Sequence, residues 1–337
     1  MKKVCVVGCG SISPVHINAL KETKYADLFA VCDIVPEKAD KCANKYGAKA
    51  FYNFDDVISC SEIDSVHICT PHYLHVEMAI KALESGKYVV LEKPAAINLE
   101  ELKKLQEANE KHKGKLSLIL QNRTNPCVVA LNKDIKETDC GNLLGSKAFL
   151  TWKRTKEYYE KDAWRGKWAT EGGGLMINQA VHILDLLCWL SGGVKSVKAT
   201  MSNKTLADVI EVEDTAEALF KLKNGGDAVL FATNAYTPNG SVNLELNFEN
   251  VTYRYADSFL YKIEKGKMPT IIADDNVSVK WKNYWGAGHL CAINAFYSAI
   301  SGENNDYITL DDGLNSAKTL LAMYESAKNN GVEILIN

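Results

Sequence analysis

The 337-residue sequence lacks the features that mark several other classes of protein. It has no apolar run of 18 residues, and Met1-Lys2-Lys3 leads directly into an apolar strand without a signal-peptide core. Its ten cysteines include no Cys-x-x-Cys pair, so we expect small buried side chains and neither a disulfide framework nor a metal site. These absences predict a soluble, cytoplasmic protein.

The sequence also lacks a large excess of positive or negative charge. A formal net charge of −3 leaves no basic surface for nucleic acid. At 47% hydrophobic residues, the chain is long enough to bury two cores. We expect a dinucleotide-binding domain over residues 1–122 and a substrate-binding and oligomerisation domain over residues 123–337.

The first third alternates short apolar strands with helical segments. This pattern is typical of a parallel sheet wrapped by helices. The expected strands are 4–7, 28–32, 65–70, 88–91 and 116–120.

A glycine turn follows the first strand. Gly8 and Gly10 stand at the spacing of a dinucleotide-binding turn, and a small residue, Ser13, takes the third glycine position. Gly10 lets the backbone approach a pyrophosphate at the following helix N-terminus. We therefore assign cofactor contacts to Gly8, Gly10, Ser11 and Ile12.

Asp33 ends the second strand, at the position of a ribose-binding carboxylate. Its charge would repel the 2′-phosphate of NADP, and Ile34 and Val35 follow where an arginine would welcome that phosphate. We predict NAD as the cofactor. The alternative is a simple turn-forming aspartate.

Two further turns follow parallel strands, where open α/β sheets bind ligands. One contains Thr70, Pro71 and His75, and the other is Glu92-Lys93-Pro94. Proline keeps Lys93 extended at the strand end, where an ammonium can hold a reacting hydroxyl. A surface lysine paired with Glu92 is the equally weighted alternative.

Beyond residue 122 the pattern changes to longer strands with apolar residues at every second position, as over 242–248. Such alternation indicates a sheet with one covered face. The fold class is therefore α/β, with a Rossmann domain followed by an α+β domain built on a mostly antiparallel open sheet.

One insertion interrupts these strands. Gly172-Gly173-Gly174 precedes a segment, 175–190, that contains no Lys, Arg or Glu and reads as one helix. Asn178, His182 and Asp185 recur at helical spacing and form a narrow polar stripe. The stripe is either a catalytic face or a buried structural network.

Together these motifs, with Gly86-Lys87, resemble the glucose-fructose oxidoreductase, inositol dehydrogenase and rhizopine catabolism (Gfo/Idh/MocA) family. The ordered pair of Glu-Lys-Pro and the triple-glycine helix with His182 and Asp185 is more specific than the glycine turn. The resemblance implies NAD(P)-dependent oxidation or reduction of a sugar, cyclitol or sugar-nucleotide hydroxyl. It also implies a homodimer or homotetramer formed through the second sheet.

By the same resemblance, Lys93 contacts the reacting hydroxyl, His182 exchanges its proton, and Asp185 orients His182. Many family members have aspartate four residues before the histidine, whereas this chain has Asn178. An amide positions a hydroxyl but relays no proton. This departure leaves His182 as the main acid/base candidate.

Several further side chains are candidates for substrate binding. Aromatic rings stack on sugars, and a guanidinium pairs with carboxylate or phosphate. Core, helix-cap and interdomain roles are the alternatives. The candidates are Tyr158, Trp164, Arg165, Trp168, Arg123 near Asn125, and His289.

The sequence thus predicts hydride transfer between NAD and a secondary hydroxyl of a carbohydrate-like substrate, without nucleic acid, membrane or metal. Two alternatives remain: an NAD-dependent glycosidase that oxidises its sugar transiently, and a non-catalytic NAD-binding sensor.

Overall fold

A computed structural model describes residues 1–275, 288–303 and 306–336. The chain forms two compact units, one of residues 1–124 and 279–313, the other of residues 125–278 and 314–337. The division expected from the sequence assigned all residues after 122 to the second part. Segment 279–313 instead returns to the first unit.

The first unit is built on a six-stranded sheet in the order β3-β2-β1-β4-β5-β6, and every pair is parallel. The strand order reverses between β1 and β4, which is the switch point where doubly wound sheets bind ligands. The strands are β1 (Lys2–Val7), β2 (Ala26–Cys32), β3 (Lys49–Phe51), β4 (Ser65–Ile68), β5 (Tyr88–Leu91) and β6 (Leu116–Leu118).

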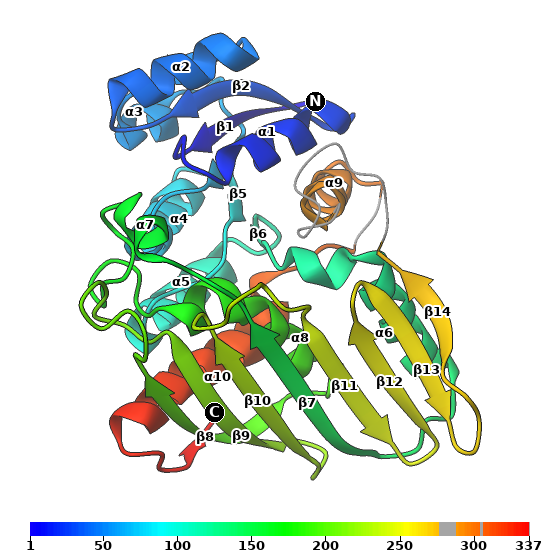
Figure 1. The fold of residues 1–337 in the computed structure, drawn as a ribbon. Coiled ribbons are helices and arrows are strands. Elements are labelled where there is room, and N and C mark those ends of the chain that lie inside the picture. The colour runs from blue at the N-terminus through cyan, green and yellow to red at the C-terminus, as the bar shows by residue number, and fades with distance from the viewer. Residues whose placement is uncertain (276–287, 304–305, 337) are drawn as a thin grey trace. The chain divides into compact units, whose positions relative to one another are not determined.

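Six helices belong to the described part of this unit (Figure 1). They are α1 (Ser13–Glu22), α2 (Pro36–Tyr46), α3 (Phe54–Ser59), α4 (His75–Glu84), α5 (Leu99–Lys111) and α9 (Gly288–Ile300). The last is the returning segment, whose Ile293 and Phe296 are fully buried in one cluster with Val6 and Ile17. This apolar contact explains why α9 belongs here.

The second unit contains a nine-stranded sheet in the order β14-β13-β12-β11-β7-β10-β9-β8-β15. All neighbours are antiparallel except β7 and β10, so the expected mostly antiparallel sheet is confirmed. The strands β13 and β14 were not anticipated. The strands are β7 (Leu143–Thr151), β8 (Val194–Ser202), β9 (Thr215–Leu222), β10 (Asp227–Thr233), β11 (Asn243–Phe248), β12 (Val251–Ala256), β13 (Phe259–Glu264), β14 (Thr270–Asp274) and β15 (Ile334–Leu335).

Helices α6 (Pro126–Glu137), α8 (Val181–Leu190) and α10 (Leu310–Lys328) cover one face of this sheet (Figure 1). Strand β9 shows the alternation that results, with Ala218 and Phe220 buried and Leu219 and Lys221 exposed. A short helix, α7 (Lys156–Glu160), precedes the triple-glycine segment.

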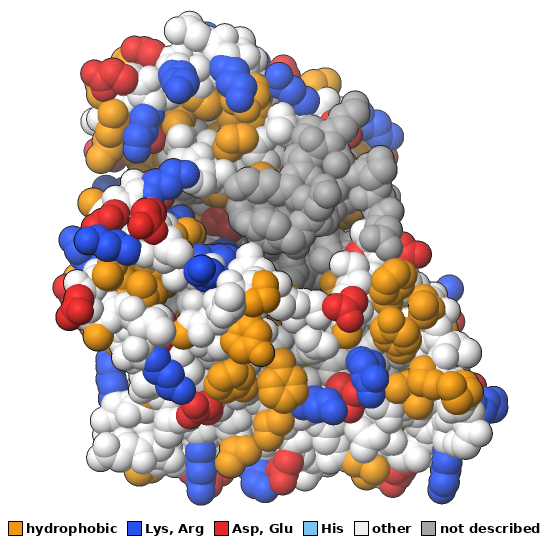
Figure 2. All heavy atoms as spheres, in the orientation of Figure 1, with side chains coloured by type: hydrophobic (Ala, Val, Ile, Leu, Met, Phe, Trp, Pro, Cys, Tyr) orange, Lys and Arg blue, Asp and Glu red, His pale blue; other side chains and the backbone are white. Residues whose placement is uncertain are grey.

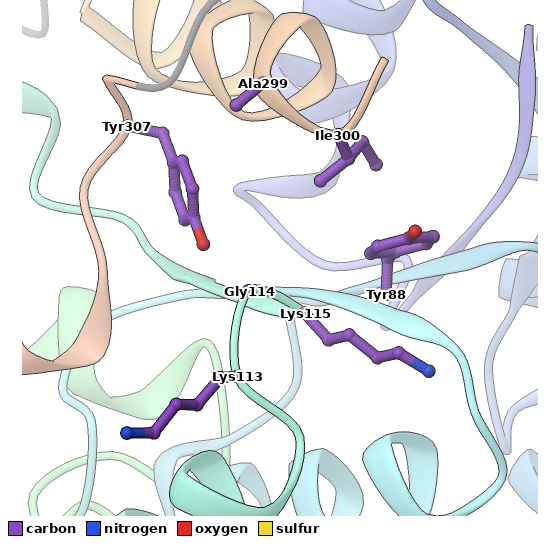
Figure 3. A pocket seen from close by; sticks show the side chains of 7 residues that line it. All are labelled: Tyr88, Lys113, Gly114, Lys115, Ala299, Ile300 and Tyr307. Atoms are coloured by element: carbon purple, nitrogen blue, oxygen red, sulfur yellow. The ribbon is translucent and has the colours of Figure 1, made fainter. Parts of the chain in front are cut away.

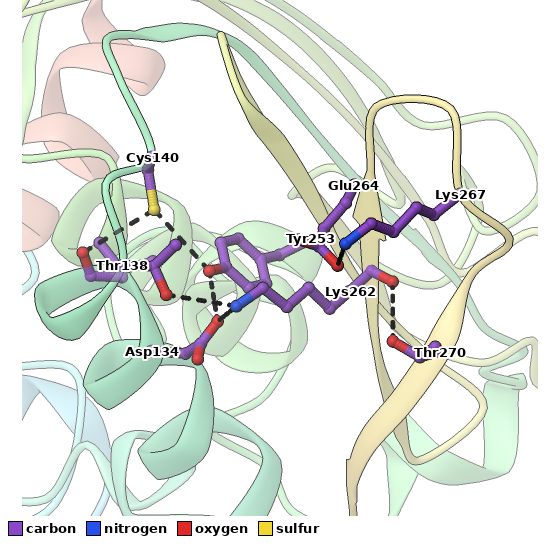
Figure 4. Close-up of polar contacts among 9 residues, drawn as sticks. Asp134, Thr138, Cys140, Tyr253, Lys262, Glu264, Lys267 and Thr270 are labelled. Carbon is purple, nitrogen blue, oxygen red and sulfur yellow. Dashed lines mark hydrogen bonds and ion pairs between the residues drawn. The ribbon is translucent and has the colours of Figure 1, made fainter.

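A polar cluster fastens α6 to the sheet (Figure 4). The Asp134 carboxylate accepts hydrogen bonds from the Tyr253 hydroxyl at 2.5 Å and from the Lys262 ammonium at 2.6 Å. Burial opposes ionisation, but these donors together hold the pKa of Asp134 below its usual value. The cluster stabilises the packing of α6 on β12 and β13.

The cysteines are all free, and Cys5, Cys69 and Cys188 are among the six that are buried, whereas Cys291 is exposed. No helix in the described ranges is long and apolar enough to cross a membrane.

Candidate active site

The glycine turn fits a dinucleotide. Gly8 has φ +93°, and a Cβ there would lie 2.6 Å from the carbonyl oxygen of Cys69, so only glycine is accommodated. A Cβ on Gly10 would meet no atom within 4 Å, which leaves open space beside the backbone. Helix α1 follows, and no side chain caps its N-terminus at Ile12. Pro14 has no N–H and the Val15 N–H donates to the carbonyl oxygen of Ile12 at 3.0 Å, so we expect a phosphate to meet the N–H groups that precede Pro14.

Asp33 lies against the same turn. Its two carboxylate oxygens accept hydrogen bonds from the backbone N–H groups of Cys9, at 2.8 Å, and Val35, at 2.9 Å. These bonds fix the carboxylate and leave lone pairs for ribose hydroxyls. The glycine turn, the open helix end and Asp33 together fit the adenosine half of NAD, as the sequence predicts.

His75 joins the turns after β4 and β5. Its ring is buried, with Nδ1 2.9 Å from the carbonyl oxygen of Pro94 and Nε2 3.0 Å from that of Thr70. Burial lowers its pKa despite the two carbonyls. The structure thus places His75 between two backbone turns, and the cofactor-binding role expected for Thr70, Pro71 and His75 stays a prediction.

Glu92 is buried, and two histidine rings lie within hydrogen-bond distance of its Oε1 atom. Nε2 of His16 lies 2.9 Å away and Nε2 of His289 lies 3.1 Å away. The other oxygen accepts the Lys93 backbone N–H at 3.2 Å. Burial raises the pKa of Glu92, but the two histidines outweigh it and hold the pKa well below the usual value.

A chain of hydrogen bonds continues behind His16. Its Nδ1 lies 3.0 Å from Nδ1 of His67, and Nε2 of His67 lies 2.9 Å from the Tyr297 hydroxyl, which is 2.7 Å from the Ser65 hydroxyl. Burial lowers the pKa of His16 and holds that of His67 well below its usual value. Both rings are therefore neutral at neutral pH.

These contacts allow one arrangement of protons. Ionised Glu92 only accepts, so His16 donates from Nε2 and must accept at Nδ1. His67 then donates from Nδ1 and accepts the Tyr297 hydroxyl proton at Nε2. The donors of this chain of hydrogen bonds therefore point toward Glu92, the residue before Lys93.

Lys93 follows β5 at the carboxyl edge of the sheet and is half-buried. The alternative interpretation needed Glu92 as a surface partner for its ammonium. That carboxylate is instead buried and bonded to two histidines and a backbone N–H. Glu92 is therefore not a surface carboxylate, and a functional role for Lys93 stays a prediction.

The first unit has a pocket that is separate from the glycine turn (Figure 3). Tyr88, Lys113, Lys115 and Tyr307 are among its lining residues. Tyr88 begins β5 and Lys115 immediately precedes β6, so the hollow is at the amino edge of the sheet, opposite the glycine turn.

In the second unit, the triple glycine is required by close contacts. A Cβ on Gly173 would lie 2.0 Å from the Tyr324 hydroxyl, and one on Gly174 would lie 2.1 Å from the carbonyl oxygen of Glu213. Gly172 has φ +83°. No other residue fits this segment without displacing its neighbours.

The helix predicted over 175–190 is not uniform. Met176–Ala180 forms a π-helical turn, and regular α-helix begins only at Val181. Such turns are frequent at functional sites, and this one carries Asn178. Asn178 therefore lies in the π-helical turn, whereas His182 and Asp185 lie in the regular α-helix, and their common role stays a prediction.

Glu213 is buried beneath this turn. Its carboxylate accepts the backbone N–H groups of Gly174, at 2.9 Å, and Met176, at 2.8 Å, and the Tyr324 hydroxyl at 2.8 Å. Burial raises the pKa of Glu213 to about 7, although each donor favours the ionised form. The carboxylate anchors the start of the π-helical turn.

The members of the predicted stripe differ in environment. Asn178 donates to the buried Glu171 carboxylate at 2.5 Å, and Asp185 accepts the Ser316 hydroxyl at 2.7 Å. His182 is half-buried on the first turn of α8. Position 178 is an asparagine where many family members have aspartate. Its side-chain amide contacts a carboxylate from elsewhere in the chain, that of Glu171.

Tyr158 connects the aromatic segment to the same turn. Its hydroxyl oxygen accepts Arg165 Nη1 at 2.6 Å and Gln179 Nε2 at 3.0 Å. Arg165 is also paired with Asp162 at 3.1 Å and lies over the Trp164 ring. The Arg165 guanidinium, which we expected to bind substrate, is therefore partly occupied by contacts within the protein.

The remaining candidates have structural contacts. The Trp168 indole N–H donates to the carbonyl oxygen of Glu211 at 2.9 Å, and the buried Arg123 donates to that of Asp312 at 2.9 Å. His289 bonds Glu92 instead of lying open to a substrate. We propose supporting roles for these three.

Sequence reasoning missed His16, His67, Glu171 and Glu213. The partners of His16, His67 and Glu213 lie far along the chain, so no local spacing identifies these residues. Glu171 bonds Gly166 and Asn178, which are near in sequence but do not form a recognised motif with it. A polar residue within an apolar stretch was the one available signal.

Comparison with known proteins agrees with this architecture. Residues 2–119 match the model described as "Oxidoreductase family, NAD-binding Rossmann fold", and residues 128–254 match the Gfo/Idh/MocA C-terminal domain. Glucose-6-phosphate 3-dehydrogenase of Bacillus subtilis is 26% identical over 98% of this chain and 97% of its own. D-glucoside 3-dehydrogenase of Escherichia coli is 24% identical over 97% and 95%.

Among solved structures, the WlbA dehydrogenase of Bordetella pertussis, in complex with NADH and UDP-GlcNAcA, has a TM-score of 0.87. It is 29% identical, with coverage of 100% of this chain and 98% of that one. The family matches to both halves of the chain, and the glycine turn and Asp33 that fit NAD, lead to the same assignment. The protein belongs to the Gfo/Idh/MocA family and is an NAD-dependent dehydrogenase.

Proposed function

We propose that the protein transfers a hydride between NAD and a secondary hydroxyl of a sugar, cyclitol, glycoside or sugar nucleotide. Family membership supports the reaction type. The names of relatives support the substrate class, since two of them are 3-dehydrogenases of glucose 6-phosphate and of D-glucosides.

The observation that carries the proposal lies within the first unit. The glycine turn, Asp33 and Lys93 follow β1, β2 and β5, and these parallel strands end at one edge of the sheet. Lys93 therefore shares the edge that fits the cofactor, and its neighbour Glu92 is fixed by His16 and His289.

Each side chain has a role in the proposed reaction. Lys93 and Asn178 hold the substrate hydroxyl, and His182 accepts its proton in the oxidation. Asp185 and Glu171 position these groups from the protein side. When bound, NAD supplies the hydride acceptor, so the carbinol becomes a carbonyl. Neutral imidazole suits the proton transfer because its ordinary pKa of about 6.5 lies close to neutral pH.

Removal of the Lys93 ammonium tests this proposal. We expect Lys93→Ala to lower turnover by several orders of magnitude and to leave the dissociation constant of NAD nearly unchanged. The assay is NADH formation with polyols, hexoses, glycosides and UDP-sugars, with NADP as the cofactor control. Lys113→Ala, an exposed lysine paired with Glu110, is the matched control.

Unchanged turnover in Lys93→Ala would remove the lysine from the mechanism. Release of free sugar from a glycoside without accumulation of NADH would instead identify the glycosidase alternative. Binding of NAD without turnover of any compound in the panel would favour a sensor.

A further inference from the structure

Arg154 differs from the other arginine beside Tyr158. Arg165 is paired with Asp162, whereas Arg154 makes no ion pair within the described ranges. Its Nη1 donates to the carbonyl oxygen of Lys153 at 2.8 Å. Its Nε is buried and has no hydrogen-bond acceptor among the residues that the structure describes. A buried guanidinium N–H left without an acceptor is costly.

Two aromatic rings hold this guanidinium in place. Its central carbon lies 4.8 Å from the ring centre of Trp152 and 5.2 Å from that of Tyr158. The Trp152 indole N–H is itself bonded to the carbonyl oxygen of Gly240 at 3.2 Å. Arg154 is therefore ordered by its neighbours before any ligand arrives, which reduces the entropy lost on binding.

The Tyr158 hydroxyl supplies a second available donor. Its oxygen already accepts hydrogen bonds from Arg165 and Gln179, so its own proton must point elsewhere. The parts of the chain that the structure describes provide no acceptor for it. The nearby acids are engaged, because Asp162 pairs with Arg165 and Glu171 accepts Gly166 N–H and the Asn178 amide.

This region adjoins the proposed catalytic turn. Gln179, bonded to Tyr158, is the next residue after Asn178 on the π-helical turn. A ligand group bonded to Arg154 would thus be separated from that turn by the Tyr158 ring. Nε is closed to solvent, so a ligand would meet the outer nitrogens of this half-buried guanidinium, which match carboxylate and phosphate oxygens in geometry and charge.

We propose that Arg154, ordered by Trp152 and Tyr158, binds a carboxylate or phosphate group of the substrate, so that the enzyme prefers anionic sugars. This specificity site rests on the dehydrogenase function proposed above. Carboxylate and phosphate present the same kind of oxygen acceptor to a guanidinium. Pairs of substrates that differ only in the charged group show which of the two anions is bound.

The test compares the wild type with Arg154→Gln and Arg154→Lys in NADH formation. The substrate pairs are glucose 6-phosphate with glucose, and UDP-glucuronate with UDP-glucose. We expect Arg154→Gln to raise KM for the preferred anionic member roughly 10- to 100-fold, with a smaller change in kcat. Arg154→Lys should retain part of the affinity. The neutral member of the pair should be unaffected.

Arg254→Gln is the control, because Arg254 is half-exposed and paired with Glu245 on the sheet. If the wild type uses both members of each pair equally, or if Arg154→Gln raises KM for NAD instead, the subsite proposal is wrong and the dehydrogenase proposal stands. If no compound is oxidised, calorimetric titration of glucose 6-phosphate and UDP-glucuronate in the presence of NADH decides. Binding that Arg154→Gln abolishes supports the subsite, and absence of binding overturns it.

Discussion

At the scale of single residues, Glu92 connects three groups of the first unit. One of its oxygens holds two histidines and the other holds the backbone of Lys93. A negative charge held by oriented donors needs no movement when a substrate binds beside it. Glu92 is therefore a positioning residue for Lys93.

Glu92→Gln tests that role. The glutamine oxygen can still accept from both histidines, but its amide nitrogen then faces the Lys93 N–H, donor against donor. We expect the free energy of unfolding to fall by about 1–3 kcal/mol and kcat to fall more than KM rises. Urea denaturation and steady-state kinetics measure the two effects. Loss of stability with unchanged kcat would assign Glu92 to the fold alone.

Buried histidines make stability depend on pH. Burial places the folded-state pKa of His16, His67 and His75 below 6.5, so their contribution is complete above pH 6.5 and is lost as the pH falls. Each contributes at most about 1.4 kcal/mol per pH unit. Glu213 acts oppositely, since its raised pKa of about 7 stabilises the fold as pH falls from 7 toward 4.5.

We therefore expect the free energy of unfolding to decrease between pH 6.5 and pH 5, because three histidines outweigh one glutamate. Urea titrations across this range provide the measurement, and His67→Asn should reduce the slope by about one histidine's share. Stability that rises toward pH 5 in the wild type would contradict this account.

At the scale of elements, the triple glycine and Glu213 hold the π-helical turn as one assembly. Gly174 N–H donates to the Glu213 carboxylate, and the Gly174 Cα faces the Glu213 backbone carbonyl. The turn that presents Asn178 thus depends on contacts across 39 residues of sequence.

Gly174→Ala should disrupt this assembly, because its methyl group would lie 2.1 Å from a backbone oxygen. We expect a loss of several kcal/mol in unfolding free energy, of the order seen for severe steric changes, together with a strong loss of turnover. Gly47→Ala is the comparison. Its Cβ would meet open space, and its φ of +74° costs only about 1–2 kcal/mol. Gly174 does not have a positive φ, so a loss no larger than that of Gly47→Ala would show that the close contact with Glu213 relaxes at little cost.

At the scale of the whole molecule, the uncovered face of the second sheet is the candidate for self-association. Leu219 and Val229 pair across β9 and β10, and Phe149 and Phe231 pair across β7 and β10, all on the outward face. Figure 2 shows hydrophobic side chains gathered over these strands among charged ones. A contiguous apolar patch of this kind favours a protein contact.

We expect Leu219→Glu to shift a homodimer or homotetramer toward smaller species, because a carboxylate would be buried at the contact. Sedimentation velocity measures the change. Val129→Glu, at a half-exposed position on α6, should leave the mass unchanged. An assembly that tolerates Leu219→Glu would place the interface elsewhere.

The local sequence determined the parallel sheet, most strands of the second sheet, the glycine turn with Asp33, and the position of Lys93 at a strand end. Strand alternation and turn residues act through near neighbours in the chain, so one sequence suffices to predict them. Tertiary structure alone decided the return of α9 to the first unit, the histidines on Glu92, the π-helical turn and the position of Arg154, which makes no ion pair with any described residue. These depend on contacts between residues far apart in sequence, such as His16 with Glu92 and Glu213 with Gly174, which no local pattern records.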